Sequence, residues 1–400
     1  MATSPSTRRH DLDWLRVLVI LVVFVFHCGR FFDTDGWHVK NPVRHPAVQV
    51  WTVFLVCWMM PLIFVISGAS TFYALGARRT GQFVKDRALR LLVPLFVGIF
   101  SHIALQVYLE RVSFSGFKGS FFKFYPLYFH GLYGLGGNFA WMGLHLWYLE
   151  ALFVSSVLSL PLLVWWKAGG GRRWLDMFGN LFVRGGMIYL PALAPALLIG
   201  FLDPKTFWGQ RGFGGWPLPA YLFYFLYGFI LVSREALDKQ VEKLRWCSLA
   251  GGAGLFLVLC VAWKMGADPA PGTGRYEVLL SLFGLSSWGF ILGFLGLARR
   301  RLDFSNSFLS YANEAVLPFY VLHQTIILTL GFFIVRWAIP DSLKFLLIAG
   351  SAFPLIAGSY EFGIRRNNPM RFLFGMKLLR ADLKPRATPE PAGAMQEVRR

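Results

Sequence analysis

Apolar runs long enough to cross a lipid bilayer recur along the whole of this chain, and no other feature constrains its fold as strongly. A helix needs about 20 apolar residues to cross the hydrocarbon core of a membrane. Hydrophobic residues make up 56% of the 400 residues and charged residues only 15%, whereas a soluble domain carries about 25% charged residues. The sequence therefore predicts an all-α, polytopic bundle of transmembrane helices embedded in a lipid bilayer.

The apolar runs predict ten membrane spans, and the basic residues between them predict their orientation. With the N-terminus in the cytoplasm, the inner segments carry 27 of the 40 Lys and Arg residues and the outer segments carry 12. This bias follows the positive-inside rule and predicts that both termini are cytoplasmic. The spans are expected at 12–29, 47–75, 87–109, 141–166, 186–202, 217–232, 246–263, 277–298, 314–337 and 342–362.

The chain is expected to divide into a membrane domain at 1–365 and a cytoplasmic basic segment at 366–400, in which 381–400 form a disordered tail. The N-terminus has a basic lead and an apolar core but no small-residue cleavage site, so it is interpreted as an uncleaved first span. The net charge of +19 comes from basic residues in short loops, which act as topology signals, so we expect no nucleic-acid partner. The four cysteines show no metal or redox spacing, and no metal site is expected.

The first span, residues 11–29, carries ionisable residues that are costly to keep in a membrane. At about 100° and 1.5 Å per residue, Arg16 and His27 lie about 20° apart around the helix and about 16 Å apart along it. Asp13 precedes Arg16 by one turn and can pair with it. This stripe is either a functional site or a packing stripe, in which Asp13 and Arg16 meet water and His27 is a core histidine.

An Arg-x-x-Arg pair, Arg87 and Arg90, follows the second span at the expected inner surface. The pattern places both guanidinium groups on nearly one face at the start of a helix. Arginine side chains suit phosphate groups, and a helix N-terminus also favours anions. Cytoplasmic anions with a phosphate-rich handle include coenzyme A thioesters. The alternative is that these basic residues only fix the topology.

Two later spans also contain polar residues at membrane depth. Glu150 lies about 13 Å into the membrane from Trp141, and His323 lies in the middle of the ninth span. These two residues and His27 are expected at middle to outer depths, where they could share one polar cavity. The outer loop at 110–140 is rich in aromatic residues and glycine, and it either binds a sugar ring or sits at the lipid interface.

Four motifs in this order resemble those of the membrane-bound acyltransferase 3 family. They are the Arg-x10-His of the first span, FxxSG in the second, RxxR before the third and HLWYLE in the fourth. The resemblance covers about residues 10–365, and LPFYVLHQ in the ninth span is closer to the glucan biosynthesis protein C subgroup, the glucan succinyltransferases. It implies an enzyme that moves an acetyl or succinyl group from cytoplasmic acyl-CoA to a carbohydrate hydroxyl across the bacterial inner membrane. Acyl-CoA would be a donor substrate, with no permanently bound cofactor.

The resemblance also implies roles for individual residues. Arg16 and His27 would be the essential pair, and Arg87 with Arg90 would bind the donor. Glu150 is in doubt, because HLWYLEALF replaces the W-S-L-x-x-E-E form found in the O-antigen acetylases. The complete expected site is catalytic His27, Arg16, Glu150 and His323, donor-binding Arg87 and Arg90, and substrate-lining Asp13, Ser67, Gly68 and His145.

The mechanism expected on this basis uses a neutral His27 ring as the general base that deprotonates the acceptor hydroxyl. Glu150 would orient or charge-balance that ring, and a covalent acyl-histidine relay remains open. Two rivals belong to other classes: a transporter or flippase for a glycan or acyl precursor, and a non-catalytic partner of an envelope-polymer synthase. A homo-oligomer or a glucan-synthesis partner is also possible.

Overall fold

The computed structural model describes residues 8–77, 79–266 and 269–379. Every regular secondary-structure element within these residues is a helix. The predicted all-α class is therefore confirmed. The elements are α1 (His10–Gly29), α2 (Pro46–Ala77), α3 (Thr80–Phe100), α4 (Ile103–Phe114), α5 (Phe121–Tyr128), η1 (Leu144–Leu146), α6 (Trp147–Lys167), α7 (Gly169–Val183), η2 (Gly185–Ala192), α8 (Leu193–Phe201), α9 (Leu218–Leu231), α10 (Glu235–Lys264), α11 (Gly274–Arg301), α12 (Ser307–Ile334), α13 (Asp341–Gly358), η3 (Ser359–Ile364) and α14 (Asn368–Leu373).

Seven of the described helices are long and apolar enough to cross a membrane, and the number rises to nine if each of two bent pairs counts as one span. The first pair, α3 with α4, bends by 41°, and the second, α7 with Gly185–Phe201, bends by 112°. The predicted span at 217–232 corresponds to α9, which has only 14 residues. All ten predicted runs thus coincide with helices, while the count of ten spans and the side of each terminus stay predictions.

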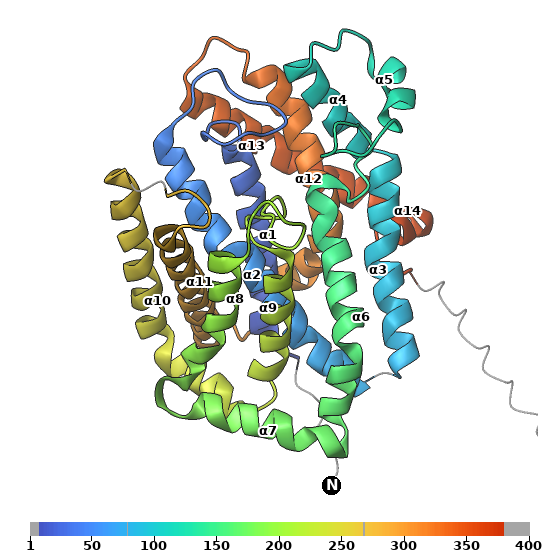
Figure 1. Cartoon of the computed structure of the whole chain (residues 1–400). Helices are drawn as coiled ribbons and strands as arrows, with labels where there is room; N and C mark the ends of the chain where they lie inside the picture. The colour runs from blue at the N-terminus through green and yellow to red at the C-terminus, as the bar shows by residue number, and fades with distance from the viewer. Residues whose placement is uncertain (1–7, 78, 267–268, 380–400) are drawn as a thin grey trace, which may run out of the picture.

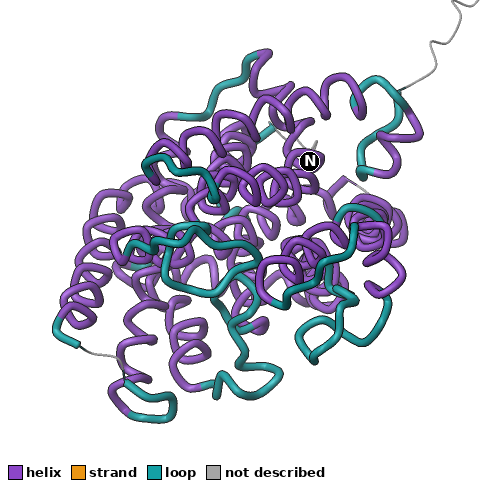
Figure 2. The backbone as a smooth tube through the Cα atoms, turned by 90° about the horizontal axis from the view of Figure 1, so that it is seen from above, coloured by secondary structure: helices purple, strands orange, loops and turns teal. Residues whose placement is uncertain are grey.

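α1 lies inside the bundle, between α2 and α12, and most of the long helices run side by side with it (Figures 1 and 2). Glycines allow some of these helices to approach closely. A Cβ atom on Gly68 of α2 would lie 1.8 Å from the carbonyl oxygen of Phe225, and one on Gly228 of α9 would lie 1.9 Å from that of Val65. Small residues are the usual means of close helix packing in membranes. Gly68 therefore serves the packing of α2 against α9.

α7 is an amphipathic helix that lies across the end of the bundle where α1 begins (Figure 1). Its buried residues, Gly171, Leu175, Gly179 and Phe182, recur at helical spacing and form one face. The predicted spans at 141–166 and 186–202 leave this stretch as a basic connecting segment at the inner side. The structure shows an amphipathic helix there instead.

The opposite end of the bundle carries the loop between α1 and α2 and the segment from α4 to η1 (Figure 1). The predicted outer loop at 110–140 contains the last turn of α4, the short helix α5 and an isolated bridge between Leu132 and Phe139. In the predicted cytoplasmic segment at 366–400, residues 368–373 form α14, which packs against α3. The predicted tail at 381–400 lies outside the described residues.

Candidate active site

A cavity of about 490 Å³ lies between α1, α2, α3, α6 and α12. Its charged lining residues contain more positive than negative groups, because four arginines but only two aspartates line it. We call it the arginine cavity. Its charged residues are Arg8, Asp13, Arg16, Asp86, Arg87 and Arg90.

Arg16 is held in the arginine cavity by partners from three helices. Its Nη1 donates to Asp13 Oδ1 at 3.0 Å and to Asn313 Oδ1 at 3.2 Å, and its Nη2 donates to Ser70 Oγ at 2.8 Å. The predicted pairing of Asp13 with Arg16 is confirmed. These contacts fix the guanidinium group at the cavity wall.

Arg87 and Arg90 both line the arginine cavity, but they do not lie at the start of a helix. α3 begins at Thr80, so the two arginines occupy its second and third turns, and the predicted helix start was wrong. The polar stretch before Arg87 contains no proline and continues the helix. The anion preference of a helix N-terminus therefore does not apply. Arg87 donates to Thr71 Oγ1 at 2.6 Å, and its guanidinium carbon lies 5.2 Å from the centre of the Phe83 ring.

The hydrogen bonds of His27 define which of its ring nitrogens carries a proton. Nδ1 lies 2.8 Å from the carbonyl oxygen of Val23, one turn earlier in α1. A carbonyl oxygen can only accept, so Nδ1 is the donor. The lone pair of the neutral ring is then on Nε2, and no described residue donates a hydrogen bond to it. His27 thus has the proton arrangement of a general base.

His323 packs against the Nδ1 side of the His27 ring. Its Nδ1 donates to the carbonyl oxygen of Tyr320 at 2.5 Å, which leaves the lone pair of the neutral ring on Nε2. That Nε2 lies 3.3 Å from Nδ1 of His27. His323 can therefore accept from the same N–H that Val23 accepts from, and it can stabilise a positive charge on His27. The structure brings these two predicted residues together.

His145 completes a layer of three histidines. Its ring centre lies 5.0 Å from that of His323, and its Nε2 donates to the carbonyl oxygen of Val321 at 3.1 Å. Its Nδ1 accepts from Gln106 at 3.3 Å. His145 is buried and does not line the arginine cavity, and its ring packs against His323. In the described residues, no group of three or more His, Cys, Asp or Glu side chains is placed to hold a metal ion.

Tyr320 lies between the arginine cavity and the histidine layer. It lines the cavity, its hydroxyl donates to the carbonyl oxygen of His145, and its ring centre lies 5.5 Å from that of His323. Tyr148 packs edge-on against it at 5.7 Å. The cavity therefore ends at Tyr320, and the contacts from there to His27 run through His323.

The polar side chains that hold this histidine layer in place were not predicted from the sequence. Gln106 is buried; it donates to Thr325 at 2.5 Å and accepts from Gln324 at 3.0 Å. His102, at the break between α3 and α4, lies 2.8 Å from Thr325 Oγ1. A glutamine in an apolar run is costly in a membrane, and that cost was the available signal. This support fixes the orientation of the ring of His145.

The remaining predicted residues lie elsewhere. Ser67 lines the arginine cavity, where its hydroxyl donates to the Ile63 carbonyl oxygen at 2.7 Å and lies 2.9 Å from the Tyr148 hydroxyl. Glu150, in the first turn of α6, is neither in the cavity lining nor bonded to a histidine in the described residues. The part expected of Glu150, to orient the ring of His27, is filled by Val23 and His323.

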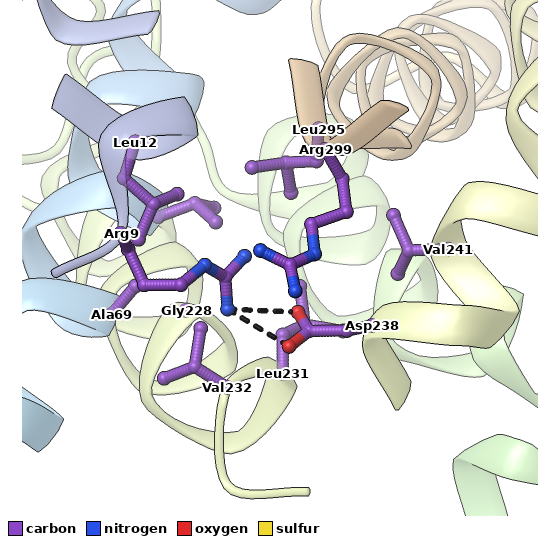
Figure 3. Close-up of a pocket in the computed structure, with 11 residues that line it drawn as sticks. Arg9, Leu12, Ala69, Gly228, Leu231, Val232, Asp238, Val241, Leu295 and Arg299 are labelled. Atoms are coloured by element: carbon purple, nitrogen blue, oxygen red, sulfur yellow. Dashed lines mark hydrogen bonds and ion pairs between the residues drawn. The ribbon is translucent and has the colours of Figure 1, made fainter. Parts of the chain in front are cut away.

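A second, much smaller cavity of about 20 Å³ lies next to a compact ion-pair cluster (Figure 3). Arg9 pairs with Asp238 and Asp11 at 2.8 Å each, and Arg299 points toward Asp238 (Figure 3). We call these four residues the closed cluster. It joins the start of α1 to α10 and α11 and leaves no room for a substrate.

Comparison with known proteins gives the chain a family. The model of an acyltransferase domain, acyltransferase 3, matches residues 9–361. The glucans biosynthesis protein C of Salmonella agona and that of Salmonella paratyphi A are each 22% identical over 402 residues, which cover 94% of this chain and 97% of theirs. No solved structure matches the chain. The long apolar helices and the family match together show that the chain belongs to the acyltransferase 3 family and is an integral membrane acyltransferase.

Proposed function

We propose that this enzyme moves an acetyl or succinyl group from cytoplasmic acyl-CoA to a hydroxyl of a carbohydrate, a glucan by similarity to the named relatives, at the outer side of the bacterial inner membrane. The family membership favours this reaction over a transporter or a non-catalytic partner. The relatives' name supports a glucan as the acceptor and a glucan-synthesis machinery as the setting. A second copy of the chain or a glucan-synthesis protein is a possible partner.

One observation carries this proposal: an unprotonated Nε2 on His27 is connected through His323 and Tyr320 to a large arginine-lined cavity. A phosphate-rich donor suits guanidinium groups, which form charge-assisted hydrogen bonds to phosphate oxygens. A partly buried, oriented imidazole suits proton transfer. The two parts match the two ends of a coenzyme A thioester.

In the proposed reaction, the phosphates of acyl-CoA bind at Arg16, Arg87 and Arg90. The pantetheine arm and the acyl group extend past Tyr320 once that side chain turns aside. The acceptor hydroxyl gives its proton to Nε2 of His27 while its oxygen attacks the thioester carbonyl carbon. The carbon–sulfur bond then breaks, and the thiolate takes the proton from His27. The products are the ester and free coenzyme A.

The support behind His27 explains why a neutral partner is sufficient. When His27 becomes positive, its Nδ1–H points at the carbonyl oxygen of Val23 and at the lone pair of His323. Both are acceptors, so the charge is stabilised without a carboxylate. A base that is oriented by a third group is the general arrangement for proton transfer in acyl-transfer enzymes.

Replacement of His27 tests the proposal. We expect His27→Ala to lower kcat for acyl transfer by about 10²- to 10⁴-fold, the usual contribution of a general base, with the KM for acyl-CoA nearly unchanged. Membranes that contain the variant would be incubated with radiolabelled acetyl-CoA or succinyl-CoA, and label would be measured in glycans.

The control is His130→Ala, which removes an exposed histidine from the segment between α5 and η1. It should keep full activity, and both variants should reach the membrane in equal amounts. Acyl transfer by His27→Ala at the rate of the unchanged protein would refute the catalytic role of His27.

A further inference from the structure

The ring of Trp37 lies beside His27, near the end of α1. The two ring centres are 6.0 Å apart and the planes are inclined by 37°. Trp37 belongs to the loop between α1 and α2, and it is only partly buried. On this side His27 is therefore flanked by a large, partly exposed aromatic ring, whereas toward the arginine cavity it is separated from the space by His323 and Tyr320.

The backbone on both sides of Trp37 is held firmly. Phe31 packs edge-on against its ring at 4.8 Å. Lys40 Nζ donates to the carbonyl oxygens of Arg30 and Asp33 at 2.6 and 2.7 Å, and to the Asp33 carboxylate at 2.7 Å. Because these bonds close the loop on itself, Trp37 has a fixed position relative to α1.

A second set of contacts joins this loop to α4 and the segment after α5. His38 is bonded to the Glu110 carboxylate, which also accepts from the Tyr133 hydroxyl at 2.7 Å and from Arg111 Nη1 at 3.0 Å. Burial and the neighbouring Glu110 raise the pKa of Tyr133, so its hydroxyl stays protonated and remains a donor. Arg111 also donates to the carbonyl oxygen of Gly137 at 2.9 Å. The charged groups here bind one another, whereas Trp37 is apolar and keeps part of its surface exposed.

We infer that Trp37 is the stacking platform for the sugar ring of the acceptor, which it places with a hydroxyl beside Nε2 of His27. A sugar ring presents a face of C–H groups that packs on an aromatic ring, and tryptophan offers the largest such surface among the side chains. A rigid platform loses little entropy when it binds a ligand. The surrounding charges are paired, so the site favours a neutral sugar ring over an anion. This inference rests on the proposed function for the role of His27.

The experiment compares Trp37→Ala and Trp37→Phe with a control, Trp337→Ala. Trp337 is 51% exposed and lies in the connection between α12 and α13. This connection is at the same end of the bundle, since Asp341, at the start of α13, contacts His45 of the loop between α1 and α2 at 2.9 Å. The full-length protein in detergent would be titrated with a soluble gluco-oligosaccharide, and acyl transfer from labelled acetyl-CoA and succinyl-CoA to the same oligosaccharide would be measured in parallel.

We expect Trp37→Ala to weaken oligosaccharide binding and to raise its KM by about three- to tenfold, the usual contribution of one aromatic contact. The KM for acyl-CoA should not change, Trp37→Phe should restore most of the binding, and Trp337→Ala should behave like the unchanged protein.

Three results would overturn the inference: no binding of the oligosaccharide by the unchanged protein, equal binding by Trp37→Ala, or faster hydrolysis of acyl-CoA without loss of binding. The last result would make Trp37 a lid that keeps water from His27. Binding that depends on Trp37, together with no transfer from either donor, would instead contradict the proposed function and leave the platform standing.

Discussion

Two groups of arginines occur near the start of α1, and only one of them surrounds a large space. In the closed cluster, Arg9 contacts two aspartates, and Arg299 points at Asp238 and also pairs with Asp303 at 2.8 Å. The arginine cavity, of about 490 Å³, is lined by four arginines and two aspartates. The same residue type thus forms a structural bond in one place and a candidate binding surface in the other.

The difference between the two groups lies in charge balance and not in the number of arginines. Guanidinium groups that are matched by carboxylates draw together and fix the helices that carry them. An excess of guanidinium groups around a cavity creates a positive potential that attracts an anion. The charge of the lining residues and the volume of the space therefore distinguish a candidate binding site from a cluster that only holds helices together. Three variants test this distinction.

The largest effect is expected from Asp238→Ala in the closed cluster. It removes one of the two carboxylates that pair with Arg9, and loss of one partner of a largely buried ion pair costs about 3 kcal/mol of the free energy of unfolding. Denaturant unfolding in detergent micelles measures this change, while the KM for acyl-CoA should stay the same. Asp303→Ala breaks only an exposed pair and should cost less than about 1 kcal/mol. Equal losses of stability in the two variants would contradict the structural role of the closed cluster.

The next effect is expected from the double variant Arg87→Gln with Arg90→Gln. Glutamine keeps a neutral hydrogen-bond donor at each position, so the pair together should lose about 1.5–3 kcal/mol of binding free energy, and the KM for acyl-CoA should rise by about 10- to 100-fold with a small change in kcat. The matched control removes two exposed arginines from α7, Arg172→Gln with Arg173→Gln, and it should leave the KM unchanged. If both double variants raised the KM equally, the arginines would act only through general electrostatic attraction.

The smallest effect is expected from Asn313→Ala, which removes one neutral acceptor from Arg16 and leaves Asp13 and Ser70 in place. A single hydrogen bond contributes about 1 kcal/mol, so the KM for acyl-CoA should rise by about two- to fivefold. Asn180→Ala removes a similar bond to Arg234 outside the cavity and serves as the control. A KM that does not respond to Asn313→Ala would show that Arg16 needs no positioning.

The sequence could predict the helices and one of the ion pairs, because both depend on local spacing. Apolar runs located the membrane helices, and a one-turn separation predicted the bond between Asp13 and Arg16. The approach of His27 and His323 was predicted only as a shared depth. Their contact depends on how α1 packs against α12, which spacing along one helix does not determine.

Two features could not be predicted from the sequence, for identifiable physical reasons. The start of α3 at Thr80 was missed because a polar stretch without proline can continue a helix out of the membrane. The role expected of Glu150 was filled by Val23 and His323, and a backbone carbonyl oxygen gives no signal in a sequence. Gln106 carried a signal, a polar residue in an apolar run, whose partners became clear only from the packing of α4 against α12.

The position of Tyr320 also bears on how such a bundle would avoid leaking protons across a membrane. A continuous column of water through the bundle would conduct protons and discharge the gradient across an energised membrane. Tyr320 lines the end of the arginine cavity and its hydroxyl is bonded to the backbone of η1, a position from which it would interrupt such a column. In the proposed reaction, the acyl group displaces this ring, so the side chain that admits the acyl group would also be the one that prevents leakage.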